Sequence, residues 1–337
     1  MKKLSIIILI TAIIIAVGSC KKNNEENIPA VYTPSPLTIN IPSNLPIMVI
    51  PSDNPTTVEG VELGRRLYYD SLLHPDHKMA CASCHVQSAG FTTQGTNVIP
   101  HINLGFSNKF LWNGAVQGSL EDAMLFEVKD FFKTDISKLQ NTSVYPEMFN
   151  KAFGSNVISE QRCAYALAQF LRTMVSGNSK FDKFKRNELV LNLEELKGWM
   201  IFFTEQGDCF HCHSLSLMTD GNLHNIGLDS VFAGSNAGYY NVSNNPADLG
   251  KFKTPSLRNC GIRTSFMHDG RFHTLDEVIE HYNSYVKISP SVDPIMTKPG
   301  KANGLQLTDE DKKNLKAFLL TLTDSVYLNN AAFSSPF

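Results

Sequence analysis

The sequence predicts an all-α protein with two domains and long irregular loops, and three observations support this prediction. Several stretches carry apolar residues at the spacing of an amphipathic helix, whereas the strict alternation typical of half-buried strands is scarce. With 337 residues, the chain is long enough to form two domains with cores of their own. A five-residue cysteine motif occurs once in each half, at residues 81–85 and 209–213.

Both motifs read Cys-x-x-Cys-His, which is the attachment signature of c-type haem. Two thiols on one helical turn can form thioethers with the two vinyl groups of a single porphyrin, and the adjacent histidine can bind the iron. We therefore expect His85 and His213 to be the proximal iron ligands. Four cysteines are expected to hold the two covalent haem c groups: Cys81, Cys84, Cys209 and Cys212.

A zinc site built from the two Cys-x-x-Cys pairs is the alternative. It leaves the histidine after each second cysteine unexplained. It also places the pairs 128 residues apart (209 minus 81), much farther than in zinc ribbons. A thioredoxin-like motif would lie in a βαβ context, which the pattern of the chain does not show. Two haem sites are therefore the prediction.

The first twenty residues are predicted to be a lipoprotein signal peptide. Two lysines precede an apolar run, residues 4–17, that is too short to span a membrane comfortably, and small residues lead to Cys20. The pattern resembles a bacterial lipoprotein signal, in which Cys20 becomes the lipidated first residue; ordinary signal cleavage is the alternative. Either way the chain leaves the cytoplasm, and we expect a periplasmic protein anchored to a membrane by lipid.

The remaining chain is predicted to consist of a tether and two haem domains. Residues 21–45 are rich in Asn, Glu, Pro and Ser, which is typical of a flexible tether. Residues 46–185 are expected to form the N-terminal haem domain and residues 190–327 the C-terminal one. The formal charge of −2 and the lack of a basic patch argue against nucleic acid as a partner.

Helical spacing and N-terminal capping residues define the elements in chain order. We expect helices at residues 58–69, 120–132, 159–175, 193–205, 274–285 and 308–322. Residues 214–258 show no periodicity. So long an irregular region fits a compact domain only because a porphyrin would supply part of the core. Cys163 lies in an apolar helical stretch and is expected to be a buried free thiol; a disulfide with Cys260 is the alternative.

The order of motifs along the chain resembles that of the bacterial di-haem cytochrome c peroxidase and MauG family. The first half carries Phe-Leu-Trp-Asn-Gly at 110–114 and Leu-Glu-Asp at 120–122. The second half carries Leu-His-Asn-Ile-Gly at 223–227, Phe-Lys-Thr-Pro-Ser-Leu-Arg-Asn at 252–259 and Met-His-Asp-Gly-Arg at 267–271. The resemblance extends over nearly the whole chain after the leader and implies two cytochrome-c-like domains packed face to face.

The resemblance implies a peroxidase that reduces hydrogen peroxide to water with electrons from a small periplasmic cytochrome c or copper protein. It assigns the peroxide chemistry to the N-terminal haem and electron transfer to the C-terminal haem. Two alternatives stay open: MauG-like oxidation of a protein or organic substrate, and a non-catalytic di-haem electron-transfer lipoprotein. Some members of the family bind a calcium ion between the two domains. For this chain, both a calcium ion and a homodimer stay open.

Two residues of the first half are candidates for the chemistry at the peroxide site. His101 lies sixteen positions after His85 (101 minus 85), where the family places a histidine that caps the resting haem. An alternative alignment makes His101 a helix residue without a role at the iron. The family's distal glutamate and its neighbouring proline are missing here. Glu127 is the nearest candidate for acid–base catalysis; a solvated carboxylate on a helix face is the alternative.

The resemblance also assigns roles around the C-terminal haem. Trp112 is expected to relay electrons between the haems, or else to be a core residue at the domain interface. Counting fourteen positions from His268 leads to Tyr282 (282 minus 268), which the MauG-like branch uses as the sixth iron ligand. Met296 as the ligand and a core tyrosine are the alternatives. Arg258 and His268 are expected close to the haems, with Arg258 paired to a propionate.

Overall fold

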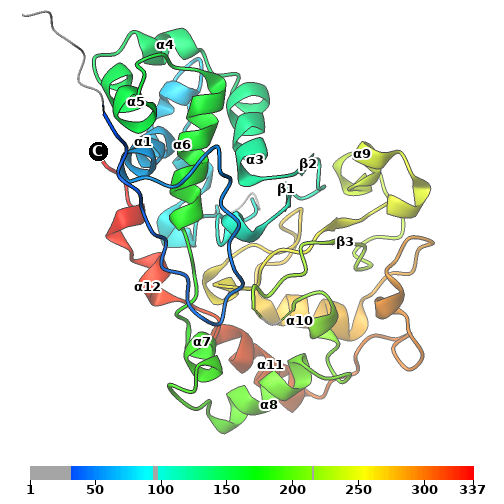
Figure 1. Cartoon of the computed structure of the whole chain (residues 1–337). Helices are drawn as coiled ribbons and strands as arrows, with labels where there is room; N and C mark the ends of the chain where they lie inside the picture. Colours follow the sequence, from blue (N-terminus) through cyan, green and yellow to red (C-terminus); the bar gives the residue numbers. More distant parts are fainter. Residues whose placement is uncertain (1–31, 94–97, 215) are drawn as a thin grey trace, which may run out of the picture. The chain divides into compact units, whose positions relative to one another are not determined.

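Helices are the main regular elements of the computed structural model, which describes residues 32–93, 98–214 and 216–337 (Figure 1). The predicted signal peptide, Cys20 and residues 21–31 of the predicted tether lie outside the described residues. Within the described ranges, no helix is long and apolar enough to cross a lipid bilayer.

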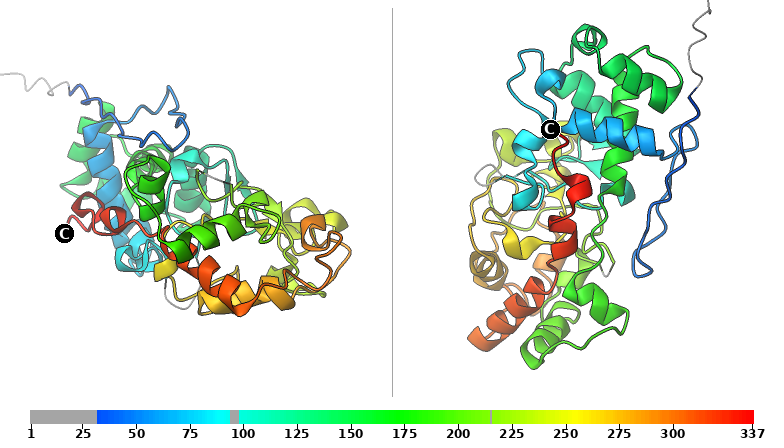
Figure 2. Two further views of the ribbon diagram at one scale, coloured as in Figure 1. Left: turned by 90° about the horizontal axis from the view of Figure 1, so that it is seen from below. Right: turned by 90° about the vertical axis from the view of Figure 1, so that its left-hand side faces the viewer.

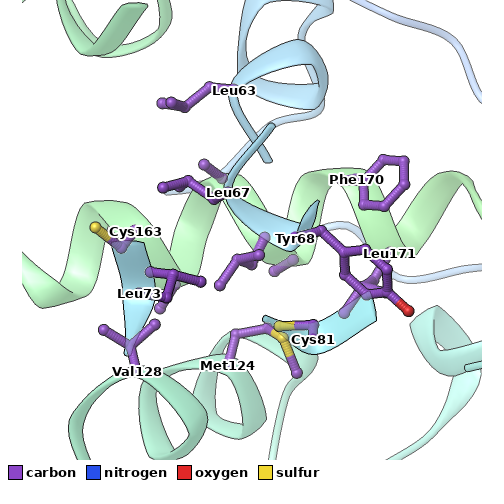
Figure 3. Close-up of a cluster of buried hydrophobic side chains, with 14 of the residues drawn as sticks. Leu63, Leu67, Tyr68, Leu73, Cys81, Met124, Val128, Cys163, Phe170 and Leu171 are labelled. Atoms are coloured by element: carbon purple, nitrogen blue, oxygen red, sulfur yellow. The ribbon is translucent and has the colours of Figure 1, made fainter. Parts of the chain in front are cut away.

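The core of the first half forms where helix α1 (Val58–Tyr69) packs on helix α6 (Glu160–Thr173). Both helices match their predicted ranges closely, and the side chain of Thr57 caps α1 by accepting a hydrogen bond from a backbone N–H of its first turn. The two helices approach closely at Gly64, since a Cβ placed there would lie 1.9 Å from the backbone oxygen of Ala166. Figure 3 shows the apolar side chains of this core, which include a cysteine of the first haem motif.

Helix α3 (Leu120–Phe126) begins after the capping residue Ser119 and then changes its winding. Residues Glu127–Phe131 form a π-helical turn, so the predicted helix 120–132 is an α-helix continued by a π segment. Such segments are rare and frequently lie at functional sites. The prediction missed two helices of this half, α4 (Ile136–Gln140) and α5 (Tyr145–Phe153). The half also contains α2 (Cys81–Cys84) and the antiparallel strands β1 (Lys109–Phe110) and β2 (Val116–Gln117).

The second half repeats the helix packing of the first with α8 (Leu193–Phe202) and α11 (Asp309–Leu320). A glycine again permits the close approach, because a Cβ placed at Gly198 would lie 1.9 Å from the backbone oxygen of Asn314. The two halves therefore share one packing unit, a glycine-bearing helix that precedes the haem motif and a later helix that covers it.

The remaining elements of the second half surround the second haem motif. Helix α10 (Leu275–Ser284) begins after its predicted cap, Thr274. The described residues of the region 214–258, predicted to be irregular, form short elements, which include α9 (Tyr240–Ser243) and the antiparallel strands β3 (Leu223–His224) and β4 (Phe252–Lys253). Most of this region is therefore loop, as its lack of periodicity predicts.

Buried apolar side chains gather in two clusters, and these clusters cross the predicted domain boundaries. Phe181, on α7 (Lys180–Lys185), belongs to the second cluster, although the prediction places it before residue 185 in the N-terminal domain. Tyr327, on α12 (Ser325–Leu328), belongs to the first cluster, although the prediction assigns it to the C-terminal domain. The periodicity of apolar residues shows which face of a helix is buried, but it does not show against which cluster that face packs.

The predicted tether ends earlier than residue 45. The backbone N–H of Ser35 donates to Glu59 Oε2 at 2.7 Å, and Pro36 forms an isolated β-bridge with Thr57. Leu45 is buried. Pro- and Ser-rich composition predicts flexibility, whereas this stretch packs on the body as extended backbone. The prediction is therefore wrong from residue 35 onwards.

Candidate haem sites

Each attachment motif contains a short helical turn before its final histidine, α2 in the first motif and a 3-10 turn, Cys209–His211, in the second. In the first motif, Cys81 is buried, Cys84 is partly exposed, and both are free thiols. The backbone N–H of His85 donates to the oxygen of Cys81 at 2.9 Å, and the N–H of His213 donates to the oxygen of Cys209 at the same distance. Two free thiols one turn apart, followed by a histidine, are the arrangement that covalent attachment of a haem requires.

Both motif histidines are held in one tautomer by a backbone carbonyl. His85 Nδ1 donates to the oxygen of Phe91 at 3.0 Å, and His213 Nδ1 donates to the oxygen of Met218 at 3.0 Å. Burial lowers the pKa of each imidazole to about 4, so both are neutral at pH 7. A neutral imidazole that donates through Nδ1 presents Nε2 as a metal ligand, which fits the predicted proximal role.

The acceptor residues Phe91 and Met218 were not predicted as part of the sites. Both are fully buried and both adopt a left-handed backbone, with φ of 60° and 56°. This conformation is unusual for bulky residues. No local sequence signal marks them, because their role depends on the direction of a carbonyl group.

His101 lies directly beside the proximal histidine of the first motif. The ring centroids of His85 and His101 are 3.4 Å apart, with an angle of 13° between the planes. The hydroxyl of Tyr68, on α1, lies 3.2 Å from His101 Nδ1 and 3.3 Å from the oxygen of His85. His101 is in irregular backbone, so the alternative that makes it a helix residue is wrong.

The stacked arrangement differs from ligation of one iron by both histidines. Stacking brings the ring faces of His85 and His101 together, whereas two ligands of one iron direct their ring nitrogens toward it from opposite sides. In this structure His101 is therefore not placed as a second ligand of an iron held by His85 Nε2. The role of His101 as a capping ligand stays a prediction.

Glu127 begins the π-helical turn and lies close to the first attachment motif. Its side chain is partly buried, and its charge acts on the Cys81 thiol, whose pKa is raised chiefly by burial. Burial raises the pKa of Glu127 itself to about 7. A carboxyl group with this pKa can accept and return a proton near neutral pH, which a solvated carboxylate on a helix face cannot do as effectively.

The second motif opens onto a large cavity. Cys209, Cys212, His213 and Tyr282 all line it, and the space between the lining side chains amounts to about 1650 Å³, including the part open to solvent. The residues present, two free thiols, a neutral imidazole and a phenol around an apolar space, fit a covalently attached haem.

Tyr282 and Met296, the two candidates for the sixth ligand of the C-terminal haem, both line this cavity. Tyr282 comes from α10, and burial raises its pKa, with a smaller contribution from the nearby Cys212. The phenol is therefore neutral in the chain alone, and a bound iron would have to replace its proton. The choice between the two side chains stays a prediction.

Trp112 and His268 reach the same cavity from different halves of the chain. Trp112 lies between β1 and β2 of the first half, and its backbone oxygen accepts a hydrogen bond from the N–H of Lys253 at 2.8 Å. His268 stacks on Phe252 with 3.6 Å between ring centroids. A residue of the N-terminal half thus borders the C-terminal haem cavity, which is where an electron relay would have to lie.

The predicted pairing of Arg258 with a haem propionate is not what its surroundings favour. Its guanidinium is 1% exposed and donates to both carboxylate oxygens of Asp182, at 2.8 and 2.9 Å. The cations that do line the C-terminal cavity include Arg263 and Lys253. Burial lowers the pKa of Lys253 to about 8, so a haem carboxylate close to its ammonium would stabilise the charged form.

His224 is a charged residue of the cavity wall. Its Nε2 donates to Asp220 at 2.9 Å and its Nδ1 donates to Asp293 at 2.5 Å. These two hydrogen bonds raise the pKa of His224 to about 12. Both ring nitrogens are therefore occupied by carboxylates in this structure. Asp220 lies only four positions before His224, so the sequence gives a weak signal for this contact. Asp293 is brought close to His224 only by the fold.

An acidic cluster lies beside the second motif. Glu205, Asp208 and His211 bring ligand atoms within 4.8 Å of one another. The ammonium of Lys298 contacts both carboxylates and lies 2.6 Å from Asp208 Oδ1, so this cluster is an ion-pair network that does not favour a metal cation. Calcium stays a prediction from the resemblance. Cys163 and Cys260 are both buried and free, so the predicted thiol at 163 is confirmed.

Two attachment turns, two neutral imidazoles and an apolar cavity beside the second motif define the class as a di-haem c-type cytochrome. Comparison with known proteins gives the family. The family model described as "Di-haem cytochrome c peroxidase" matches residues 58–189. The chain is 31% identical over 291 residues to the methylamine utilization protein MauG of Methylophilus methylotrophus, covering 81% of this chain and 84% of that protein. It therefore belongs to the di-haem cytochrome c peroxidase family.

Other relatives carry both kinds of family name. The chain is 28% identical over 337 residues to the cytochrome-c peroxidase IdrP1 of Denitromonas iodatirespirans, covering 83% of this chain and 85% of that protein. It is also similar to the crystal structure of a MauG-like protein associated with microbial copper homeostasis. That match has a TM-score of 0.79 and 28% identity, and it covers 89% of this chain and 99% of the other. Family membership implies haem c and an oxidoreductase of the peroxidase or MauG type.

Proposed function

We propose that this protein is a di-haem peroxidase that reduces hydrogen peroxide to water with electrons from a small cytochrome c or copper protein. The observation that carries the proposal is Glu127, a partly buried carboxyl group beside the first attachment motif whose pKa burial raises to about 7. A peroxidase needs an acid–base group at this place, whereas an electron carrier does not.

Each residue of the N-terminal site has a separate role in the proposed reaction. When bound to His85, the haem supplies the iron at which peroxide is reduced. Glu127, as the carboxylate, takes a proton from peroxide and gives it to the leaving oxygen. The carbonyl of Phe91 holds His85 in the tautomer that leaves Nε2 available. Two electrons and two further protons complete the conversion of one peroxide into two waters.

The C-terminal site is proposed to deliver the electrons. Trp112 borders the cavity of the second motif while belonging to the first half, which supports its role as a relay between the sites. Tyr282 is the proposed sixth ligand in that cavity. A tyrosine there also favours the second candidate function, MauG-like oxidation of a protein or organic substrate, because a phenolate stabilises oxidised iron.

Glu127→Gln tests the proposal. Because the carboxylate is the reactive form, peroxide turnover by the wild type is expected to rise as the pH passes through about 7. The variant is expected to lose roughly 10²–10⁴-fold in rate and to lose this pH dependence. Asp130→Asn, at an exposed position of the same π-helical turn, is the matched control. An unchanged rate in Glu127→Gln would refute the acid–base role, and a wild type without turnover would favour an electron carrier.

The proposal also places the protein in the periplasm, attached to a membrane by lipid at Cys20. The support is the leader pattern, which a covalent haem protein also requires, because attachment takes place outside the cytoplasm. Cys20→Ala should move the protein from the membrane fraction to the soluble periplasmic fraction, and a wild type that is already soluble would contradict the anchor.

A further inference from the structure

The end of the chain leaves the second half and packs on the first. The C-terminus lies beside α1 in both Figure 1 and Figure 2. Arg65, on α1, donates through Nε to the oxygen of Ser334 at 2.7 Å and through Nη2 to the oxygen of Ala331 at 3.0 Å. The hydroxyl of Tyr69 donates to the oxygen of Phe333 at 2.6 Å. This tail, residues 325–337, is therefore attached to the N-terminal half by several hydrogen bonds.

The tail is also bonded to the chain just after the first attachment motif. Gln87 Nε2 donates to the oxygens of Leu328 and Asn330, at 3.1 and 2.9 Å. Gln87 Oε1 accepts a hydrogen bond from the hydroxyl of Ser334 at 2.9 Å. Gln87 follows the proximal histidine by two positions, so these contacts reach the haem site itself.

Tyr327 is the residue of the tail that contacts the histidine pair most directly. Its side chain is 2% exposed, and its hydroxyl donates to the backbone oxygen of His101. Its ring lies 5.5 Å from that of Phe91, centroid to centroid. The oxygen of Phe91 in turn accepts hydrogen bonds from His85 Nδ1 at 3.0 Å and from the backbone N–H of His101 at 3.2 Å. Tyr327 thus supports both histidines of the N-terminal site.

Tyr327 is itself fixed by the residue that caps its helix. Asp324 Oδ1 accepts the backbone N–H of Tyr327 at 3.0 Å, and Asp324 Oδ2 accepts the N–H of Gly177 at 3.0 Å. The N–H of Asp324 donates to the side chain of Asn259 at 2.6 Å. Asn259 precedes Cys260, which lines the cavity of the second motif. The tail is therefore held at one end by the second half and touches the first haem site at the other.

We infer that Tyr327 is a positioning residue of the N-terminal haem site, supplied by the C-terminal tail. Its hydrogen bond to the carbonyl of His101 fixes where the imidazole of His101 lies relative to the iron on His85. The inference rests on a haem bound to the first motif and on the predicted role of His101 as its capping ligand, and not on the reduction of peroxide.

Tyr327→Phe is the test, because phenylalanine keeps the ring that packs on Phe91 and removes only the hydroxyl. In the oxidised two-haem protein, we expect the electron paramagnetic resonance signal of the N-terminal haem to shift toward the high-spin form. We also expect that haem to bind cyanide faster, while the C-terminal haem keeps its signal. The N-terminal signal is assigned by its loss in Cys84→Ser. Tyr69→Phe is the matched control, since it removes another hydrogen bond to the tail but none to His101.

The result is decided by comparison with a His101→Ala background. If Tyr327 acts through His101, adding Tyr327→Phe to His101→Ala should cause no further change in signal or cyanide binding. A shift that persists in this background, or an equal shift in Tyr69→Phe, would overturn the inference. So would wild-type behaviour of Tyr327→Phe. Full occupancy by two haems shows that each variant folds. Peroxide turnover, measured in parallel, distinguishes failure of the proposed function from failure of this inference.

Discussion

The two halves of the molecule place the same backbone features around different side chains. Asn103 and Leu111 have a left-handed backbone, with φ of 57° and 64°, and lie eight positions apart. Asn259 and Met267, also eight positions apart, have φ of 59° and 66°. The backbone N–H groups of the two asparagines donate to the equivalent carbonyls after the covering helices, Met174 and Leu322, each at 3.1 Å. The halves are therefore structural repeats that the sequence conceals.

The repeat places Glu127 and Tyr282 at the same position. Helix α3 begins after Ser119 and helix α10 after Thr274, each with a capping box, and each key residue lies eight positions after its cap. One half thus has a carboxyl group and the other a phenol eight positions after the corresponding cap, Glu127 at the start of the π-helical turn and Tyr282 within α10. A carboxyl with a pKa near 7 suits proton transfer, whereas a phenol suits binding of oxidised iron. This pair of side chains is one difference between the two sites, beside the histidine that stacks on His85 in the first and the cavity that borders the second.

Loss of a haem is the largest expected effect and tests whether the halves bind haem independently. Cys84→Ser and Cys212→Ser should each lower the intact mass by one haem group, because each removes a thioether from one motif only. The wild type should exceed its processed polypeptide mass by two haem groups. Zinc without iron in metal analysis would contradict both sites, and loss of both haems in either variant would show that the halves do not load separately.

The glycine at each helix crossing is expected to contribute to stability in the same way in both halves. A Cβ at Gly64 or Gly198 would lie 1.9 Å from a backbone oxygen, so alanine forces the helices apart. Overpacking of this kind typically costs about 1–3 kcal/mol. Gly64→Ala and Gly198→Ala should therefore lower the midpoint of thermal unfolding of the two-haem protein.

Glu62→Ala, at an exposed position of α1, is the control for this comparison and should leave the midpoint nearly unchanged. A large effect in one half and none in the other would show that the two crossings, although alike in geometry, carry unequal parts of the stability.

The sequence predicts the parts of this structure that depend on local chemistry. The two attachment motifs, the caps Ser119 and Thr274, and helix 58–69 all follow from short patterns, and the structure has them where they were expected. Glu127 and Tyr282 were candidates because of the resemblance to the family, and the structure places each of them near an attachment motif. Local pattern is sufficient for the caps and the attachment turns because a helix converts sequence distance into a fixed direction.

The residues that sequence reasoning missed depend on tertiary contacts instead. Tyr327 acts on a carbonyl 226 positions away, and nothing near it in the chain indicates this. Arg258 matches a motif, yet the fold places Asp182 against its guanidinium and so removes it from the predicted pairing. Residues 35–45 have the composition of a tether but find partners on the body. Pairing between distant segments has no periodic signal in one sequence.

The smallest expected effect concerns the identity of the sixth ligand in the C-terminal half. If Tyr282 binds the iron there, a hard anionic ligand stabilises the oxidised haem and keeps its potential low. Tyr282→Phe removes this ligand and should raise the potential of the C-terminal haem in a redox titration, while the N-terminal haem keeps its own. Met296→Leu, which changes the other candidate in the same cavity, should leave both potentials unchanged. The opposite pattern, a shift in Met296→Leu and none in Tyr282→Phe, would make the thioether the ligand. Tyr282 would then be a packing residue, and the phenol would no longer account for a functional difference between the two haem sites.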